Sequence, residues 1–141
     1  MLERLAQRNM RAMERKDVVA IMRGWAADGV LEVAGRSSVS GRYEGKPAIE
    51  TFFRQLFDGI DTIRVTVRRV ALANPVGFTY ANTVFIEYEL DETRQAGATM
   101  HGHCVGVFEY RRGKVVAMRE WWFDPTVLDV MWGSGAALTA D

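Results

Sequence analysis

Hydrophobic side chains in the first thirty residues recur at helical spacing and predict two helices. The first covers residues 2–16, whose apolar stripe is interrupted by the polar Asn9. The second begins at an Asp17 cap and runs to about Ala27, with Trp25 on its apolar face. Both helices therefore offer one apolar side to a core, and Asn9 is a polar group on that side.

The next segment carries a short strand, a loop and a third helix. The β-branched run at residues 30–33 predicts a strand, and the stretch 35–45, rich in Gly and Ser, predicts a loop. Pro47 stands where the first turn of a helix tolerates proline. Phe53 belongs to the apolar stripe of that helix, which ends near residues 58–59.

From Thr62 onward the spacing of apolar residues changes to two, which is typical of strands. Four strands are predicted, over residues 62–72, 78–90, 100–110 and 114–123. Gly102 and Gly106 predict bulges or bends within the third of them, so the sheet should be curved. A short helical turn over residues 127–132 and a flexible tail over residues 133–141 complete the chain. Segregated helices and strands predict one α+β domain over residues 1–132.

Composition narrows the possible partners and the compartment. The 141 residues suit one domain, and 18 Lys and Arg residues balance 18 Asp and Glu residues. Because the chain is neutral and has no long basic cluster, we expect it to bind neither nucleic acid nor a membrane surface. The single cysteine, Cys104, cannot form an internal disulfide, and the N-terminus lacks the apolar core of a signal peptide. These features predict a cytoplasmic protein.

Several motifs occur in an order that resembles a known family. They are Trp25–Val30, Gly41–Ile49, Val107–Tyr110 with Gly113–Val116, and Trp122–Pro125. Together they resemble the SnoaL-like branch of the nuclear transport factor 2 superfamily. The resemblance implies a cone-shaped barrel, in which a strongly curved antiparallel sheet wraps on three N-terminal helices around an apolar pocket. It also implies a homodimer formed through the outer face of the sheet.

The activities of this superfamily imply cofactor-independent acid/base chemistry. Its members include ketosteroid isomerases, polyketide cyclases, limonene-epoxide hydrolases, scytalone dehydratases and non-catalytic binding proteins. The implied ligand is a small apolar molecule, polyketide-like or terpenoid-like, and no cofactor or metal is expected. The three catalytic positions of ketosteroid isomerase fall on Asn9, Val33 and Gly106, so that machinery is absent. The epoxide hydrolase needs an Arg-x-Asp pair where this chain has Glu87–Glu89, so its triad is incomplete.

Glu120 is the principal catalytic candidate. Counted from the Gly-Lys turn, the carboxylate that hydrolases and cyclases of the superfamily carry on the last strand falls on Glu120; counted back from Asp124, it falls on Trp121. The turn is the better reference because it sets the register of a hairpin. A carboxylate among apolar neighbours can have the raised pKa that acid/base catalysis requires. The alternative is an outward-facing glutamate paired with Arg119.

His103 is the candidate partner of Glu120. His101-Gly102-His103 matches the His-x-His pair of scytalone dehydratase, whose partner aspartate falls on Glu14. A two-residue turn at the hairpin would place residue 103 opposite residue 122, so that His103 and Glu120 share one face of the sheet. Alternatively, His103 bonds an internal backbone group. The two histidines lack the further ligands that a metal site needs.

The remaining candidates are substrate-binding residues. They are Asn9, Glu14, Trp25, Phe53, His101, Tyr88 and Trp122. Two functions stay open: an acid/base enzyme of the cyclase or isomerase, dehydratase or epoxide-hydrolase type, and a non-catalytic small-molecule-binding or assembly domain of the same fold. The first predicts a loss of turnover in Glu120→Gln and His103→Ala, and the second predicts a Glu120 that titrates near its ordinary pKa.

Overall fold

The computed structural model describes residues 2–76, 80–94 and 97–133. Four helices are present: α1 (Leu2–Glu14), α2 (Val18–Arg23), α3 (Lys46–Asp58) and α4 (Thr126–Trp132). Six strands are present: β1 (Trp25–Val33), β2 (Gly41–Glu44), β3 (Ile60–Leu72), β4 (Ala81–Arg94), β5 (Thr99–Arg111) and β6 (Lys114–Trp122). The predicted tail lies outside the described residues beyond Gly133. No helix of the described ranges is long and apolar enough to cross a bilayer.

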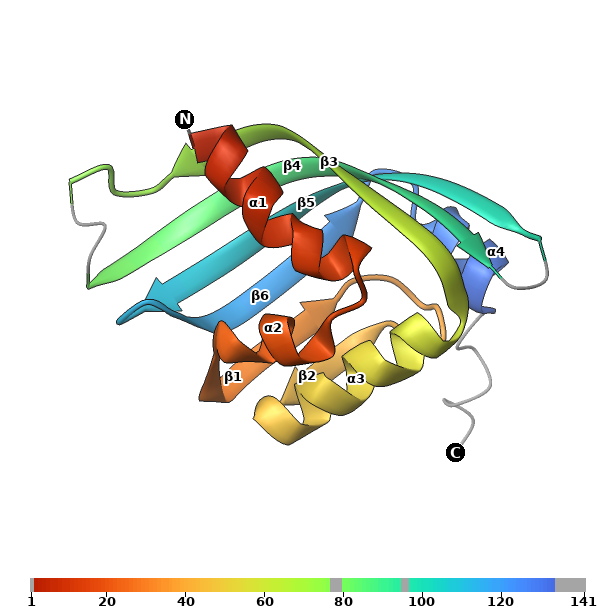
Figure 1. The fold of residues 1–141 in the computed structure, drawn as a ribbon, viewed down its shortest axis with the longest axis horizontal. Coiled ribbons are helices and arrows are strands. Elements are labelled where there is room, and N and C mark those ends of the chain that lie inside the picture. The colour runs from red at the N-terminus through yellow and green to blue at the C-terminus, as the bar shows by residue number, and fades with distance from the viewer. Residues whose placement is uncertain (1, 77–79, 95–96, 134–141) are drawn as a thin grey trace.

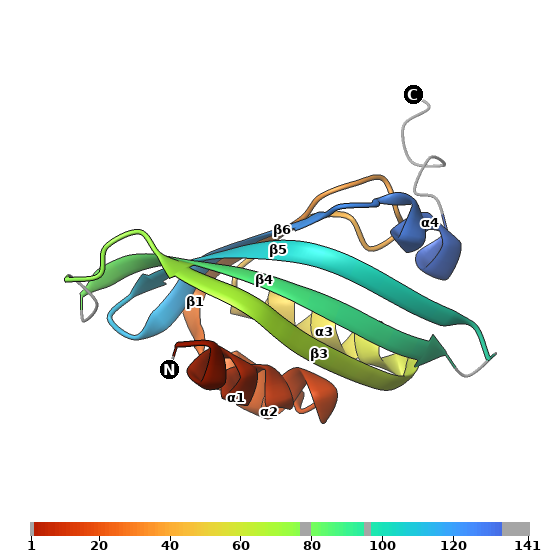
Figure 2. The same ribbon diagram turned by 90° about the horizontal axis from the view of Figure 1, so that it is seen from above.

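The six strands form one curved sheet in the order β2-β1-β6-β5-β4-β3. Figures 1 and 2 show α1, α2 and α3 on one face of this sheet, as the α+β prediction requires. The sheet is curled rather than closed, consistent with a cone. It is also mixed, since β1 runs parallel to β6 while every other neighbouring pair is antiparallel. The expected antiparallel sheet is therefore correct for all pairs except this one.

Several predicted boundaries are wrong, among them those around β1. The Asp17 side chain caps α2 as expected, accepting from the Ala20 amide at 2.9 Å, but the helix ends at Arg23 instead of near Ala27. Trp25 begins a strand because it pairs with β6, and this tertiary pairing overrides the local helical pattern. The segment predicted as loop 35–45 also contains β2, which pairs antiparallel with β1.

Helix α1 covers the free edge of the sheet. The Gln7 side chain donates to the Val65 carbonyl at 2.6 Å and accepts from the Val67 amide at 2.9 Å. The Glu14 carboxylate accepts from the Val65 amide at 3.0 Å. These side chains supply partners to edge-strand backbone groups that would otherwise be free to pair with another chain. Glu14 is thus used for the fold.

The hairpin of β5 and β6 determines which residues face the helices. Arg111 pairs with Lys114 around a two-residue turn, as predicted, but the register then shifts by one residue between Glu109 and Tyr110. Beyond this bulge Gly106 pairs with Glu120 and Cys104 pairs with Trp122. The predicted pairing of residue 103 with residue 122 is therefore wrong. Because side chains alternate along a strand, a shift of one residue changes every facing relation.

Gly102 and Gly106 are not bulges, since β5 pairs with β4 without interruption at both. They make room for rings instead. A Cβ atom on Gly102 would lie 2.0 Å from the Trp122 ring, and one on Gly106 would lie 2.7 Å from the Phe108 ring and 3.2 Å from the Tyr88 ring. Such approaches are closer than van der Waals contact allows. The two glycines therefore position the aromatic side chains of the concave face.

Candidate functional site

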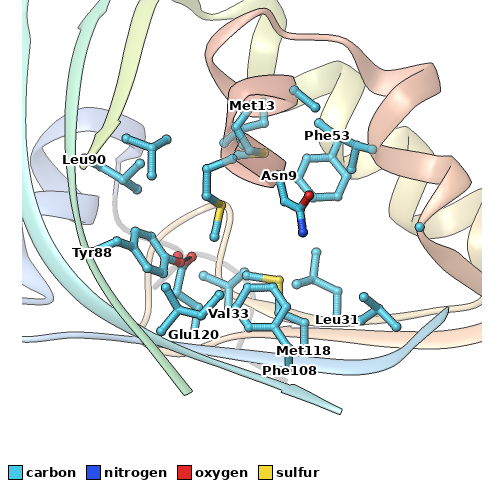
Figure 3. Close-up of a pocket in the computed structure, with 18 of the residues that line it drawn as sticks. Asn9, Met13, Leu31, Val33, Phe53, Tyr88, Leu90, Phe108, Met118 and Glu120 are labelled. Carbon is cyan, nitrogen blue, oxygen red and sulfur yellow. Dashed lines mark hydrogen bonds between the residues drawn. The ribbon is translucent and has the colours of Figure 1, made fainter. Parts of the chain in front are cut away.

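An apolar cavity of about 500 Å³ lies between the helices and the concave face of the sheet. Its walls come from α1, α2, α3 and five strands (β1, β3, β4, β5 and β6), and Leu128 and Trp132 of α4 also line it. Phe53, Leu31 and Phe108 are among the apolar groups that Figure 3 shows around it. Most of its lining is apolar, so the few polar side chains that line it are the candidates for orienting a ligand or reacting with it.

Glu120 is the principal polar group of this cavity. It lies on β6 opposite Gly106, and its carboxylate points toward the cavity beside Tyr88 (Figure 3). The Tyr88 hydroxyl donates to Oε2, and the Trp122 indole N–H donates to Oε1 at 2.8 Å. Each carboxylate oxygen therefore has a donor, and together the donors fix the orientation of the group.

The surroundings of Glu120 act on its pKa in opposite directions. Burial among apolar side chains raises the pKa, and this effect outweighs the hydrogen bonds from Tyr88 and Trp122, which lower it. Burial and the charge of Glu120 hold the pKa of Tyr88 well above its usual range, so its hydroxyl remains a donor. The result is a carboxylate held by two neutral donors in a largely apolar cavity, which is suited to taking up a proton.

Glu92 is a second carboxyl of the same cavity, and it is only 5% exposed. Its Oε2 atom is buried and has no hydrogen-bond partner among the described residues. Burial, and then the charge of Glu120, raise the pKa of Glu92 to about 7, against a smaller lowering effect of Arg94. Glu92 can therefore carry a proton near neutral pH.

Asn9 lines the cavity from α1, across from Glu120 (Figure 3). Its amide projects from α1 into the cavity (Figure 3), and no hydrogen bond to another described residue occupies it. An amide offers both a donor and an acceptor to a ligand. The cavity thus combines the carboxyls of Glu92 and Glu120, the phenol of Tyr88, the indole N–H of Trp122 and the amide of Asn9 with a largely apolar lining; Arg8 and Tyr110 also line it.

The predicted residues divide into two groups. Five line the cavity together with Glu120: Asn9, Trp25, Phe53, Tyr88 and Trp122. The other three, Glu14, His101 and His103, do not. Glu14 binds the backbone of β3, as described above.

The predicted face for the two histidines is wrong. On β4 and β5 the even-numbered side chains are buried toward the helices, and the odd-numbered ones face outward. His103 accordingly lies on the outer face, where its Nε2 is 2.9 Å from Glu87 Oε1. His101 pairs with Asp91 on the same face, at 2.6 Å. His103 therefore cannot assist Glu120 across the cavity.

Glu92 was missed because the predicted strand ended at Leu90. In the structure β4 continues to Arg94, so the Glu92 side chain points inward, as those of Tyr88 and Leu90 do. The signal was present in the sequence, since inward apolar residues recur at every second position from Val84 and extending that alternation by one step reaches Glu92. No group of three His, Cys, Asp or Glu side chains in the described ranges is arranged to hold a metal ion.

The sequence matches the SnoaL-like domain family over residues 6–118. A comparison with curated proteins finds no match. Among solved structures, Bal32a from a soil-derived mobile gene cassette is similar, with 21% identity, a TM-score of 0.76, and coverage of 90% of this chain and 92% of Bal32a. A protein of ketosteroid isomerase-like fold from Catenulispora acidiphila, solved with trimethylamine, has 14% identity, a TM-score of 0.71 and 96% coverage of both chains. TerC, co-crystallised with polyporic acid, has 17% identity, a TM-score of 0.70, and coverage of 87% of this chain and 91% of TerC.

Proposed function

The chain belongs to the SnoaL-like domain family, and from that premise we propose that it is a cofactor-independent acid/base enzyme. Its substrate is a small, apolar, oxygenated molecule bound in the cavity, and Glu120 is the group that removes a proton from it. One observation carries this proposal: a carboxylate lies in an apolar cavity and is oriented by two neutral donors.

The cavity walls support this choice of substrate. About 500 Å³ is within the range of pockets that enclose one small organic molecule. The walls are aromatic and aliphatic, so binding energy comes from apolar surface, while Asn9 supplies a hydrogen bond to an oxygen of the ligand. Two proteins of similar fold bind small organic molecules, trimethylamine and polyporic acid. Among reaction types, proton abstraction beside a carbonyl, as in isomerisation or cyclisation, uses these groups most directly.

Two small reagents test the proposal without knowledge of the natural substrate. The first is 2-tetralone, an apolar bicyclic ketone whose C1 proton exchanges with solvent in D2O and is followed by proton NMR. The second is 5-nitrobenzisoxazole, which opens to a nitrophenolate when a base removes one proton. Both reactions need a base in an apolar site, and the wild-type protein is expected to accelerate both over buffer.

Glu120→Gln tests whether Glu120 is the base, because the substitution keeps the shape of the side chain and removes its basic carboxylate. We expect both reactions to slow by about two orders of magnitude, since general-base catalysis contributes on this scale. Glu89→Gln is the matched control, because Glu89 faces outward from β4 and pairs with Arg68 at 2.6 Å. Unchanged rates in Glu120→Gln, or a wild-type protein that accelerates neither reaction, would overturn the proposal.

A second candidate is a non-catalytic binding domain. It is favoured by the fact that Tyr88 and Trp122 already occupy both oxygens of Glu120, as in a purely structural network. This alternative predicts that 2-tetralone binds in the cavity, as measured by calorimetry, while its C1 proton exchanges no faster than in buffer.

A further inference from the structure

We propose that Glu92 is the second acid/base group of the site, which gives a proton to the substrate oxygen while Glu120 removes one from carbon. This inference rests on the function proposed above and assigns the acid that such a reaction requires. An enolate formed in an apolar cavity is unstable unless its oxygen receives a proton or a strong hydrogen bond. Glu120 cannot supply both functions at once.

The position of Glu92 follows from the alternation along β4. Tyr88, Leu90 and Glu92 occupy successive inward positions, all three buried, and all three line the same cavity as Glu120. Tyr88 in turn donates to Glu120. One strand therefore places a carboxyl and the hydroxyl that orients the other carboxyl on the same wall.

The hydrogen bonding of Glu92 differs from that of the other carboxylates of β4. Glu87 contacts His103, Glu89 contacts Arg68, and Asp91 contacts His101, and all three pairs lie on the outer face. Glu92 Oε2 is buried without a partner among the described residues. A buried oxygen without a partner is costly, so it should either carry a proton or face a ligand. Both conditions hold for an acid that acts on substrate.

The surroundings of the two carboxyls favour different charge states, with Glu120 ionised and Glu92 protonated. Glu120 accepts two hydrogen bonds, which favour its ionised form, whereas no hydrogen bond from another described residue supports an ionised Glu92. The charged or titratable groups that act with Glu92 are Glu120 on β6, Arg94 on its own strand and the Cys104 thiol on β5. Burial and the charge of Glu120 outweigh Arg94 and raise the pKa of Glu92 to about 7. Two carboxyls separated in this way are suited to act as acid and base.

The step can be written for 2-tetralone with every proton accounted for. The Glu120 carboxylate takes the C1 proton, and the electron pair of that C–H bond forms the C1–C2 double bond. The carbonyl π pair moves to oxygen, which takes the proton of Glu92. The products are the neutral enol, a protonated Glu120 and an ionised Glu92. The reverse transfer, after Glu120 has exchanged its proton with D2O, places deuterium on C1.

The experiment compares the same two reagents in Glu92→Gln. Exchange of 2-tetralone needs a proton at the oxygen, so we expect it to fall by about two orders of magnitude. Opening of 5-nitrobenzisoxazole releases a stabilised phenolate that needs no proton, so Glu92→Gln should slow it far less than it slows the exchange of 2-tetralone. The tetralone reaction of the wild-type protein should also lose rate as pH rises through about 7, and this limb should be absent in Glu92→Gln.

Each result separates this inference from the proposed function. Equal losses on both reagents indicate a structural role for Glu92 and overturn the inference, and so does an unchanged exchange of 2-tetralone. In either case the loss of both reactions in Glu120→Gln still supports the proposed function. Should Glu92→Gln fail to fold, a carboxyl carbon-13 titration of the wild-type protein tests the inference by measuring the charge state of Glu92 directly. A Glu92 that is fully ionised at pH 6 overturns the inference.

Discussion

Replacement of Glu92 by glutamine should make the protein more stable at alkaline pH and leave it unchanged at acidic pH. The folded pKa of Glu92 is raised above the value of the unfolded chain. A carboxyl shifted in this direction contributes stability that is fully present below the unfolded pKa and is lost as pH rises through the folded pKa. Glutamine resembles the protonated form at every pH, so the variant does not lose this contribution.

The size of the effect follows from the two pKa values. The pKa is about 7 in the folded protein and about 4.5 for a solvated glutamate, a difference of about 2.5 pH units. At about 1.4 kcal/mol per unit, the wild-type protein should lose about 3 kcal/mol between pH 4.5 and pH 8 relative to the variant. A loss of this size is a large fraction of the stability of an ordinary domain.

Urea unfolding followed by tryptophan fluorescence at pH 5, 6, 7 and 8 measures this difference. The variant should be the more stable by about 1 kcal/mol at pH 5, and the difference should grow to about 3 kcal/mol at pH 7 and change little above that. Glu89→Gln is the control: Arg68 lowers the pKa of that carboxyl, so its contribution has the opposite sign. A constant difference between wild type and Glu92→Gln across the pH series would refute the burial argument for Glu92.

Three other substitutions test the neighbouring groups. Tyr88→Phe removes one of the two donors to Glu120, whose hydrogen bond lowers the pKa of that carboxyl, so a carbon-13 titration should find this pKa higher than in the wild type; an unchanged value would contradict the role of the hydroxyl. Gly102→Ala inserts a Cβ atom into the Trp122 ring and should cost about 1–3 kcal/mol of unfolding free energy, whereas Gly24→Ala, whose Cβ atom would approach nothing closer than 3.4 Å, should cost less. His103→Ala removes a group of the outer face, so the exchange of 2-tetralone should persist at the wild-type rate; a hundredfold loss would show that the histidine reaches the cavity.

The sequence was sufficient to predict the fold class and the helices with strong amphipathic patterns. The third helix begins and ends within a residue or two of α3, because Pro47 and Gly59 mark its ends and four apolar side chains share one face. The β1 segment could not be predicted in the same way. Trp25 is held in a strand by pairing with a strand ninety residues later, and such a long-range cause leaves no local pattern.

The sequence predicts a site residue correctly where it settles which face of the sheet that residue points to, and fails where it does not. Glu120 was placed by its distance from the hairpin turn, and it does line the cavity. The same counting put His103 on the wrong face, because the bulge near Tyr110 adds one residue to β6. A bulge of this kind depends on how two strands twist together and has no sequence signature at Val116. Beyond the bulge, the face of the sheet on which a residue lies can therefore be read only from the structure.

The two faces of β4 show how one strand serves both charge pairing and chemistry. On the outer face each acidic side chain meets a basic partner, and the Arg68 partner of Glu89 lowers the pKa of that carboxyl. On the inner face no residue within the described part of the chain donates to Glu92 Oε2, and burial raises the pKa of this carboxyl to about 7. A hydrophobic residue at that position would remove the cost of burial, so the carboxyl weakens the folded state at neutral pH. Groups that lower stability in a ligand-sized cavity are expected where activity requires them. The stability gain predicted for Glu92→Gln and the loss of proton transfer predicted for it are thus two consequences of the same buried proton.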